Sequence, residues 1–360
     1  MYPVRPQLKP ALRRVWRDGT TLQLGLDPAQ AVVITGLDPR RARLVEHLDG
    51  SADLPSLRSA AESLGLVGDT VDDLLTMLGR SGVLEDAADL RLQPDSLDRD
   101  ERDRLAPDAA AASIARPHAP SGAAVMARRR EAVVTVHGAG RVGASVATLL
   151  AAAGVGAVVV EDAGATRPAD LSPAGLGADQ LGARRQDAMT RTLRRLSASV
   201  RTSLPSGRRA SDATVLARDW GLPEPRLGER LVRAGVPHLY AAVRETTGVI
   251  GPLVLPGRSS CQRCHDLHRT DRDPAWPAIA AQLTGGGRDR VGACDAVLAT
   301  AVAAHACLQL LALLDEEVEP PPAVDGTIEI AQGDGRVRRR TWRVHPACGC
   351  AWNRPGAGPL

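Results

Sequence analysis

The fold of this protein is decided by residues 132–162, which read AVVTVHGAGRVGASVATLLAAAGVGAVVVED. The apolar run 132–136 predicts a buried strand, a glycine-rich turn follows it directly, and residues 142–153 have the composition of a helix. A second apolar strand, 157–160, then ends in Glu161 and Asp162. The order of strand, loop, helix, strand and acid is typical of the first half of a nucleotide-binding α/β fold.

The turn itself has a G-x-G-x-x-G pattern. Gly138 permits a tight turn, Gly140 lets backbone amides approach a phosphate, and Gly143 lets the helix pack closely, while the helix N-terminus favours an anion. Asp162 follows Gly138 by 162 − 138 = 24 residues, near the spacing at which a carboxylate accepts the hydroxyls of a ribose. We therefore predict that Gly138, Gly140, Gly143 and Asp162 bind a nucleotide. The alternative is a glycine-rich turn beside an incidental surface acid.

Strand and helix patterns go on alternating after this unit, with strands at 213–216 and 237–241 and a helix near 180–198. Such alternation predicts a Rossmann-like, mostly parallel sheet with helices on both faces. Two further strand-like segments, 327–330 and 336–344, are separated by Gly333-Asp334-Gly335, which indicates a C-terminal hairpin.

Four of the six cysteines form two close pairs. Cys261 and Cys264 have the C-x-x-C spacing and Cys348 and Cys350 are one residue apart, so four thiolates can surround one tetrahedral zinc ion and fasten the hairpin to the sheet. The alternatives are four unrelated buried thiols or a redox pair. A neighbouring histidine could also replace one cysteine, the candidates being His265, His268 and His345. Cys294 and Cys307 fall in an apolar segment and are expected to be small buried hydrophobic residues.

The N-terminal part predicts a small winged-helix domain at residues 1–85. Two β-like runs, 15–26 and 31–35, precede three short helical patterns, and residues 82–84 suggest a closing strand. Residues 86–131 are rich in Asp, Arg, Ala and Pro, which predicts a linker that could contain one bridging helix. Residues 132–360 then form the nucleotide-binding domain.

Composition narrows the class of protein. A length of 360 residues fits two domains, and a net charge of only +3 lacks the footprint of a dedicated nucleic-acid binder. The third N-terminal helix pattern has no Lys or Arg before Arg80, which argues against DNA contact. The start of the sequence has no secretory signal, so we expect a reducing cytoplasm. The apolar segment 293–314 is interrupted by Asp295, His305 and Gln309, so a buried helix is expected and no membrane contact.

The order of glycine loop, Asp162, later Asp, C-x-x-C, apolar helix and final cysteine pair resembles the ThiF/MoeB superfamily, which is related to ubiquitin-activating enzymes. The resemblance covers about residues 132–350. It implies an ATP-dependent, magnesium-requiring adenylation of the C-terminal carboxylate of a carrier protein or peptide, and it suggests a homodimer.

The resemblance also implies roles for single residues. Asp219 stands where the family has its magnesium-binding Asp, although the usual neighbouring Asn is Trp220. In Gly182-Ala183-Arg184-Arg185, which resembles a G-x-x-K element, Arg185 replaces the phosphate-contacting Lys, with a different donor geometry. We therefore predict Asp219 and Arg185 as catalytic residues.

Two positions depart from the family. Pro173 stands where a phosphate-clamping Arg is expected, and Gly164 replaces a second acid. Because an Arg at this place stabilises charge in the transition state, its loss weakens adenylation more than nucleotide binding. Arg167 and Arg141 are nearby cations that could substitute, but a surface role for each is the simpler expectation.

The N-terminal domain resembles PqqD-like elements that bind leader peptides, in which a peptide adds as a strand to a sheet edge. Together the two resemblances lead to a main hypothesis and an alternative. The chain is an adenylyltransferase acting on a carrier protein or precursor peptide, or a degenerate scaffold that presents a precursor to a YcaO-type cyclodehydratase. A third hypothesis, a nicotinamide-dependent oxidoreductase, explains the glycine loop but neither the cysteine pairs nor Asp219.

Overall fold

The computed structural model describes residues 3–66, 68–92, 97–116, 121–219, 222, 225–284, 292–316 and 319–352. Its chain divides into two compact units, Met1–Arg128 and Arg129–Leu360. Trp220, noted above as the replacement of a family Asn, lies outside the described residues.

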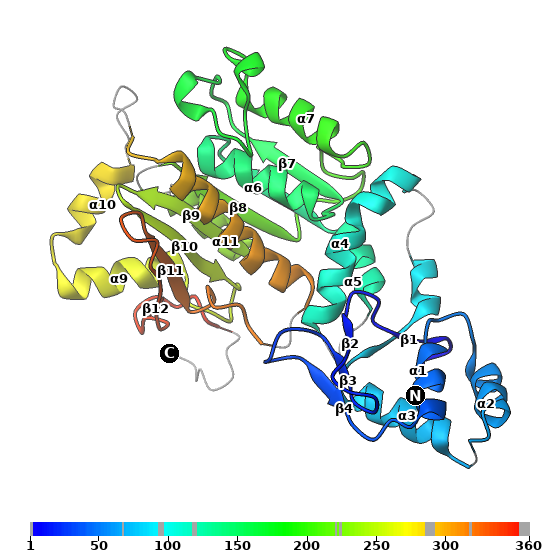
Figure 1. Cartoon of the computed structure of the whole chain (residues 1–360). Helices are drawn as coiled ribbons and strands as arrows, with labels where there is room; N and C mark the ends of the chain where they lie inside the picture. The colour runs from blue at the N-terminus through cyan, green and yellow to red at the C-terminus, as the bar shows by residue number, and fades with distance from the viewer. Residues whose placement is uncertain are drawn as a thin grey trace. The chain divides into compact units, whose positions relative to one another are not determined.

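The first part of the smaller unit, up to Asp86, contains two small sheets and the helices α1, α2 and α3 (Figure 1). An antiparallel sheet has the order β2-β3-β4, and a separate antiparallel pair joins β1 to β5. Leucines of the helices and of β1 and β3 fill one core. The elements are β1 (Pro6–Leu8), β2 (Arg14–Trp16), β3 (Leu22–Leu24), β4 (Val32–Ile34), α1 (Pro39–Glu46), α2 (Leu54–Ser63), α3 (Thr70–Arg80) and β5 (Leu84–Asp86).

The first three helices of the smaller unit, α1, α2 and α3, correspond to the three short helical patterns of the sequence. Asp38 begins α1 by accepting hydrogen bonds from the backbone N–H groups of Arg40 and Arg41, as an N-cap acid does. Strand β1 has no counterpart in the sequence analysis, because three residues that include Pro6 give no readable alternation.

The segment 86–131 contains two α-helices, whereas the sequence predicts a linker that could contain one. They are α4 (Arg99–Ala115) and α5 (Gly122–Glu131), preceded by the short η1 (Ala87–Leu92). Helix α4 is held by polar contacts: the buried Lys9 donates to the carbonyl of Ser113, and the Ser113 hydroxyl donates to Glu85. An Ala-rich helix anchored in this way shows no apolar stripe in its sequence, which is why the pattern reads as a linker.

A seven-stranded sheet forms the centre of the larger unit, in the order β12-β11-β10-β9-β8-β6-β7. Strands β7, β6, β8 and β9 are parallel, and β10, β11 and β12 continue the sheet in antiparallel register. Five of these seven strands therefore point the same way, and the predicted α/β fold with a mostly parallel sheet is confirmed. The strands are β6 (Val133–His137), β7 (Ala157–Glu161), β8 (Ala213–Arg218), β9 (His238–Arg244), β10 (Thr247–Val254), β11 (Gly326–Ala331) and β12 (Val337–Thr341).

Helices cover both faces of this sheet. Val215 and Leu239 belong to the main core with α6 and α11, whereas the neighbouring Leu216 and Tyr240 pack with residues of α8 on the opposite face, as the alternation of side chains along a strand requires. The helices are α6 (Arg141–Ala152), α7 (Arg185–Leu196), α8 (Pro225–Arg233), α9 (Gln262–Arg272), α10 (Trp276–Thr284) and α11 (Ala296–Leu314), with short turns η2 (Pro168–Asp170) and η3 (Ala178–Gln180).

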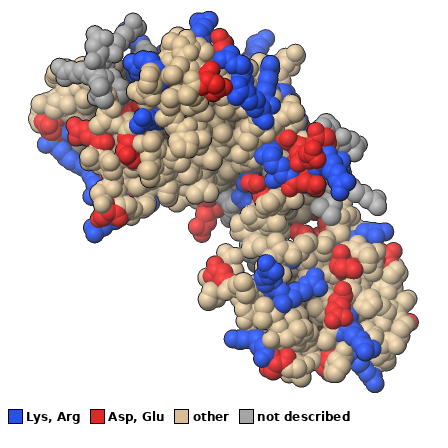
Figure 2. All heavy atoms as spheres, turned by 45° about the horizontal axis from the view of Figure 1, so that its top comes forward, with Lys and Arg blue, Asp and Glu red and all other residues tan. Residues whose placement is uncertain are grey.

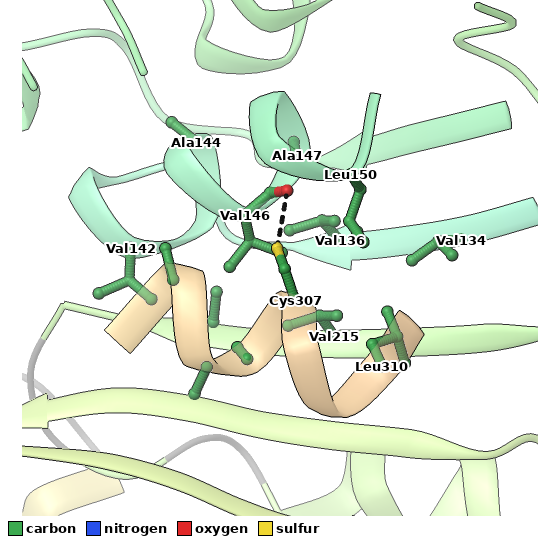
Figure 3. Close-up of a cluster of buried hydrophobic side chains, with 14 of the residues drawn as sticks. Val134, Val136, Val142, Ala144, Val146, Ala147, Leu150, Val215, Cys307 and Leu310 are labelled. Atoms are coloured by element: carbon green, nitrogen blue, oxygen red, sulfur yellow. Dashed lines mark hydrogen bonds between the residues drawn. The ribbon is translucent and has the colours of Figure 1, made fainter. Parts of the chain in front are cut away.

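Helix α11 lies beside α6 over the sheet (Figure 1). By length and composition alone it could cross a membrane, which is weak evidence because core helices pass the same test. Its Cys307 lies among valines of the sheet and of α6, with Sγ 3.6 Å from the carbonyl oxygen of Val146 (Figure 3). In this structure α11 is a core helix, and Cys307 is one of its buried apolar residues.

Candidate functional site

The glycine loop joins β6 to α6, and each of its three glycines lies where a side chain does not fit. Gly138 has φ +96°, and a Cβ there would overlap the carbonyl oxygen of Ala217 on β8. A Cβ at Gly140 would overlap the carboxylate of Asp219, and one at Gly143 would overlap the carbonyl oxygen of Gly138. The loop therefore has the close backbone packing that a phosphate-binding turn requires.

Asp162 lies directly beside this loop. Because β6 and β7 are parallel and His137 pairs with Glu161, the residue after β7 comes next to the residue after β6. Oδ2 of Asp162 accepts a hydrogen bond from the backbone N–H of Ala139 at 2.8 Å, and Oδ1 accepts one from Gly164 at 2.7 Å. The structure thus brings Asp162 and the glycines together, and Oδ1, which accepts one hydrogen bond, keeps a further lone pair.

Asp219 lies on the other side of the loop, just after β8. Its carboxylate accepts hydrogen bonds from the backbone N–H groups of Arg141 and Val142, both at 3.0 Å, in the first turn of α6. Burial raises the pKa of Asp219, while these two hydrogen bonds act in the opposite direction. The helix N-terminus that would attract a phosphate is occupied here by an internal carboxylate.

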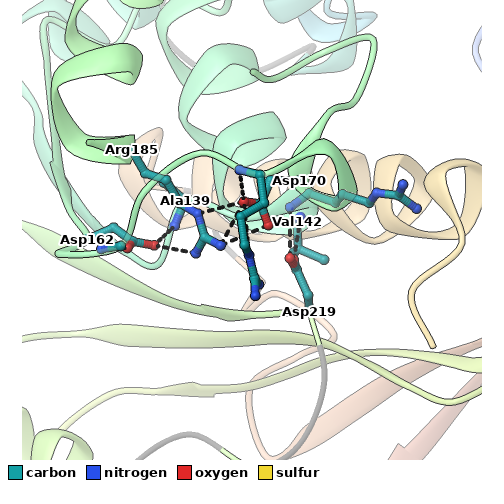
Figure 4. Close-up of polar contacts among 9 residues, drawn as sticks. Ala139, Val142, Asp162, Asp170, Arg185 and Asp219 are labelled. Carbon is teal, nitrogen blue, oxygen red and sulfur yellow. Dashed lines mark hydrogen bonds and ion pairs between the residues drawn. The ribbon is translucent and has the colours of Figure 1, made fainter. Parts of the chain in front are cut away.

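Arg185 lies between two acids (Figure 4). Its Nε and Nη2 donate to Asp170 at 3.0 and 2.8 Å, and its Nη1 donates to Asp162 at 3.3 Å. Burial by itself would lower the pKa of the guanidinium, but Asp162 and Asp170 together raise it above its ordinary value. Backbone hydrogen bonds bring the start of α7 here, since Arg185 N–H donates to Gly164 and Thr166 N–H to Ala183.

Two positions depart from the ThiF/MoeB pattern, Pro173 and Gly164. Pro173 is exposed. A Cβ at Gly164 would lie 3.0 Å from Asp162 Oδ1, so a side chain there would contact the cluster. Of the two nearby cations, Arg141 directs Nη1 to the carbonyl of Cys294 at 2.6 Å, and the mostly exposed Arg167 has Nε 3.8 Å from Asp170.

The four paired cysteines meet at one point. The Sγ atoms of Cys261 and Cys348 are 3.5 Å apart, those of Cys264 and Cys350 3.3 Å, and all four lie within 4.8 Å of one another. Thiolates about 2.3 Å from a tetrahedral zinc ion are separated by about 3.8 Å, so this donor set fits zinc. Gly349, with φ +67°, forms the turn between Cys348 and Cys350.

The three nearby histidines stay outside this cysteine cluster, so none replaces a cysteine. His265 stacks on Trp342 with ring centroids 4.5 Å apart, and burial lowers its pKa to about 3. His268 and His345 contact each other and form a separate group with Asp271, whose Oδ2 lies 2.9 Å from His345 Nε2. Cys294 is also separate from the cluster, and burial raises its pKa to about 12.

Charged residues on the surface are mixed in sign. On the face shown in Figure 2, Lys and Arg alternate with Asp and Glu over the described parts of the chain. This face presents no single extended basic region, in keeping with the net charge of +3.

These features define the class of the larger unit: a Rossmann-like α/β fold with a C-terminal cluster of four cysteines. The chain belongs to the ThiF family, whose model matches residues 114–350. None of the curated proteins compared by sequence matches it.

Several solved structures are similar in fold over almost the whole chain. E. coli MccB with AMPCPP and MccA has a TM-score of 0.70 and 16% identity, and the match covers 97% of this chain and 99% of that one. MccB with N-formylated MccA gives 0.68 and 15%, covering 96% and 99%. PaaA gives 0.67 and 14%, covering 92% and 98%.

One residue of the site has no assigned role in the sequence analysis. Asp170 is only 2% exposed, yet it receives the bidentate contact from Arg185. The sequence feature that could have indicated Asp170 is its position eight residues after Asp162. The resemblance places phosphate-binding residues in this segment.

Proposed function

We propose that this protein is an ATP-dependent adenylyltransferase that activates a carboxylate of a precursor peptide or carrier protein. The proposal depends on one observation: the glycine loop, Asp162 and Asp219 lie together at the carboxyl ends of β6, β7 and β8. The loop would accept phosphate, and Asp162 would accept the ribose hydroxyls.

The comparisons support this proposal in two ways. Membership of the ThiF family agrees with nucleotide chemistry at the glycine loop. The similar MccB structures were solved with ATP, with AMPCPP, and with MccA, and the similarity extends over both units of this chain. No observation favours the oxidoreductase hypothesis.

The proposed reaction is a substitution at phosphorus. An oxygen of the peptide carboxylate forms a bond to the α-phosphorus of ATP, the bond from that phosphorus to the bridging oxygen breaks, and pyrophosphate leaves. A magnesium ion at Asp219 would neutralise the phosphates, and Arg185 would supply a fixed positive charge next to them. The cysteine cluster would hold a structural zinc ion with no open coordination position.

We further propose that residues 1–85 recognise the peptide, in the manner of a PqqD-like element. The three-stranded sheet has β2 and β4 at its edges, and Val15, Trp16 and Val33 on these strands are each more than 40% exposed. An extended peptide could add to such an edge through backbone hydrogen bonds.

A second candidate function is favoured by a specific observation. Arg185 is held by two carboxylates, and Pro173 stands where the family has an Arg. A site with less free positive charge stabilises a developing phosphoryl transition state less well. The chain would then be a nucleotide-binding scaffold that presents a leader peptide to a YcaO-type cyclodehydratase.

Exchange of labelled pyrophosphate into ATP separates the two candidates. The full-length protein is assayed with magnesium, ATP and a candidate precursor peptide that it binds, and then with the same peptide bearing a C-terminal amide. The adenylyltransferase predicts exchange with the free carboxylate only. Binding of the peptide without any exchange would support the scaffold and refute adenylation.

A further inference from the structure

A buried ion pair between Arg185 and Asp170 lies next to the glycine loop. Asp170 is 2% exposed, and both of its oxygens accept hydrogen bonds from Arg185. Its Oδ2 also accepts a hydrogen bond from the backbone N–H of Arg167 at 2.7 Å. A carboxylate held by three donors is fixed in position, and so is the guanidinium that it binds.

This pairing uses most of the hydrogen-bonding capacity of Arg185. A guanidinium has five N–H donors, of which Asp170 and Asp162 take three. The positive charge is therefore already compensated before a ligand arrives. Arg185 can still reach a phosphate through its remaining donors, but with a much reduced net attraction.

The surrounding charges make the site more negative still. Three carboxylates, Asp162, Asp170 and Asp219, lie around Arg185, and Asp170 adds to the raised pKa of Asp219 by direct repulsion. Asp219 accepts from the N–H groups of α6 to which a phosphate would bind. Because the charge of Asp170 acts on Asp219, it also acts on a phosphate bound at this place. The second nearby cation, Arg167, has a side chain that is 61% exposed and therefore screened by solvent.

We propose that Asp170 sets the charge preference of the nucleotide site. By fixing and neutralising Arg185, it makes the site favour a nucleoside monophosphate, or a triphosphate neutralised by a divalent cation, over a free triphosphate. This inference rests on the proposed binding of a nucleotide at the glycine loop. Asp170 acts through Arg185 and through its own charge, so it is a positioning and selectivity residue and not a catalytic one.

The test compares four full-length proteins by calorimetry: wild type, Asp170→Asn, Arg185→Gln and the double variant. Each is titrated with adenosine, AMP, ATP in the presence of a chelator, and ATP with magnesium. Removing one negative charge near the phosphates should strengthen binding of metal-free ATP roughly ten-fold while changing adenosine affinity less than about two-fold. Removing the Arg185 charge should weaken metal-free ATP by a similar factor.

The double variant restores the net charge of the wild type with a neutral pair. Its affinity for metal-free ATP should return to near the wild-type value. The double variant also provides the test if Asp170→Asn folds poorly, because an Asn and a Gln can still hydrogen bond to each other. Asp179→Asn is the matched control, since Asp179 is an exposed acid of the same segment paired with Arg195. It should leave all four affinities unchanged.

Two results would overturn the inference. One is that Asp170→Asn binds metal-free ATP no more tightly than the wild type. If Asp170→Asn does not fold, the equivalent result is that the double variant binds metal-free ATP no more tightly than Arg185→Gln. The other is a gain that is equally large for adenosine, which would indicate a change of shape and not of charge. If the wild type binds neither adenosine nor any of its phosphates, the proposed nucleotide function itself fails, and the inference fails with it.

Discussion

The Asp219 carboxylate lies 3.0 Å from the backbone nitrogen of Val142, so the end of β8 is hydrogen bonded to the first turn of α6. The same carboxylate also accepts from Arg141, which places an acid on two of the N–H groups in the first turn of the helix. A phosphate bound as we propose would therefore share this position with Asp219, and a divalent cation between the two anions would allow it.

Gly140→Ala is expected to disturb this arrangement directly. A Cβ at residue 140 overlaps the Asp219 carboxylate, which would have to leave the helix N-terminus. We expect nucleotide affinity to fall at least about ten-fold and the free energy of unfolding to fall by roughly 1–3 kcal/mol. Calorimetry and urea unfolding measure the two effects. Gly333→Ala is the control, because no heavy atom lies within 4 Å of its Cβ position; equal affinity of Gly140→Ala and wild type would contradict the account.

Cys350→Ser is expected to remove the metal ion. We predict about one zinc ion per chain in the wild type, since four thiolates form one tetrahedral site, and a much lower zinc content and melting temperature in the variant. Metal analysis of the purified proteins measures this. Cys307→Ala, which changes a buried cysteine of α11 outside the cluster, should keep its zinc. Loss of zinc from Cys307→Ala as well, or full zinc content in Cys350→Ser, would count against the assignment.

Asp315→Ala is expected to destabilise the larger unit. Both oxygens of Asp315 accept hydrogen bonds from Arg129, at 2.9 and 2.6 Å, and the side chains are 0% and 9% exposed. Leaving the guanidinium buried without this partner should lower the free energy of unfolding by roughly 3–5 kcal/mol. Arg208→Ala, which breaks the partly exposed pair with Asp212, should change it by less than about 1 kcal/mol. Similar losses in the two variants would show that burial is not the deciding factor.

His238 should make the larger unit sensitive to acid. Burial lowers its pKa from 6.5 to about 4. Between these two pH values, His238 is protonated in the unfolded chain and neutral in the folded chain. Its contribution is therefore present above pH 6.5 and is lost as pH falls towards about 4, by up to the order of 3 kcal/mol. His238→Asn, which can still donate to the carbonyl of Val236, should lose less stability than wild type over this range in urea unfolding. The exposed His47→Asn should behave as wild type, and equal acid sensitivity of His238→Asn would refute the prediction.

The sequence could predict the parts of the site whose geometry is local. Gly138, Gly140 and Gly143 are tied to one turn, and Asp162 follows from the pairing of β6 with β7. The four cysteines were predictable as two close pairs, although only the fold shows that the pairs meet.

Other elements could not be predicted, because their sequence signal is weak or their contacts are distant. Strand β10 contains Gly248, Gly251 and Pro252, which interrupt the apolar run by which a buried strand is usually found. Helix α9 is mostly polar and has no clear apolar stripe. The ion pair between Asp170 and Arg185 depends on the path of the chain from η2 to the start of α7. No local sequence pattern predicts that path.

The affinity of the full-length protein for adenosine nucleotides, with and without Asp162→Ala, tests the central claim most directly. We predict that the wild type binds AMP and magnesium-ATP, and that Asp162→Ala weakens both at least about ten-fold while Asp179→Ala does not. Zinc content and melting temperature should be compared in the same samples. Equal nucleotide affinity of folded Asp162→Ala and wild type, or no binding by the wild type, would contradict the account.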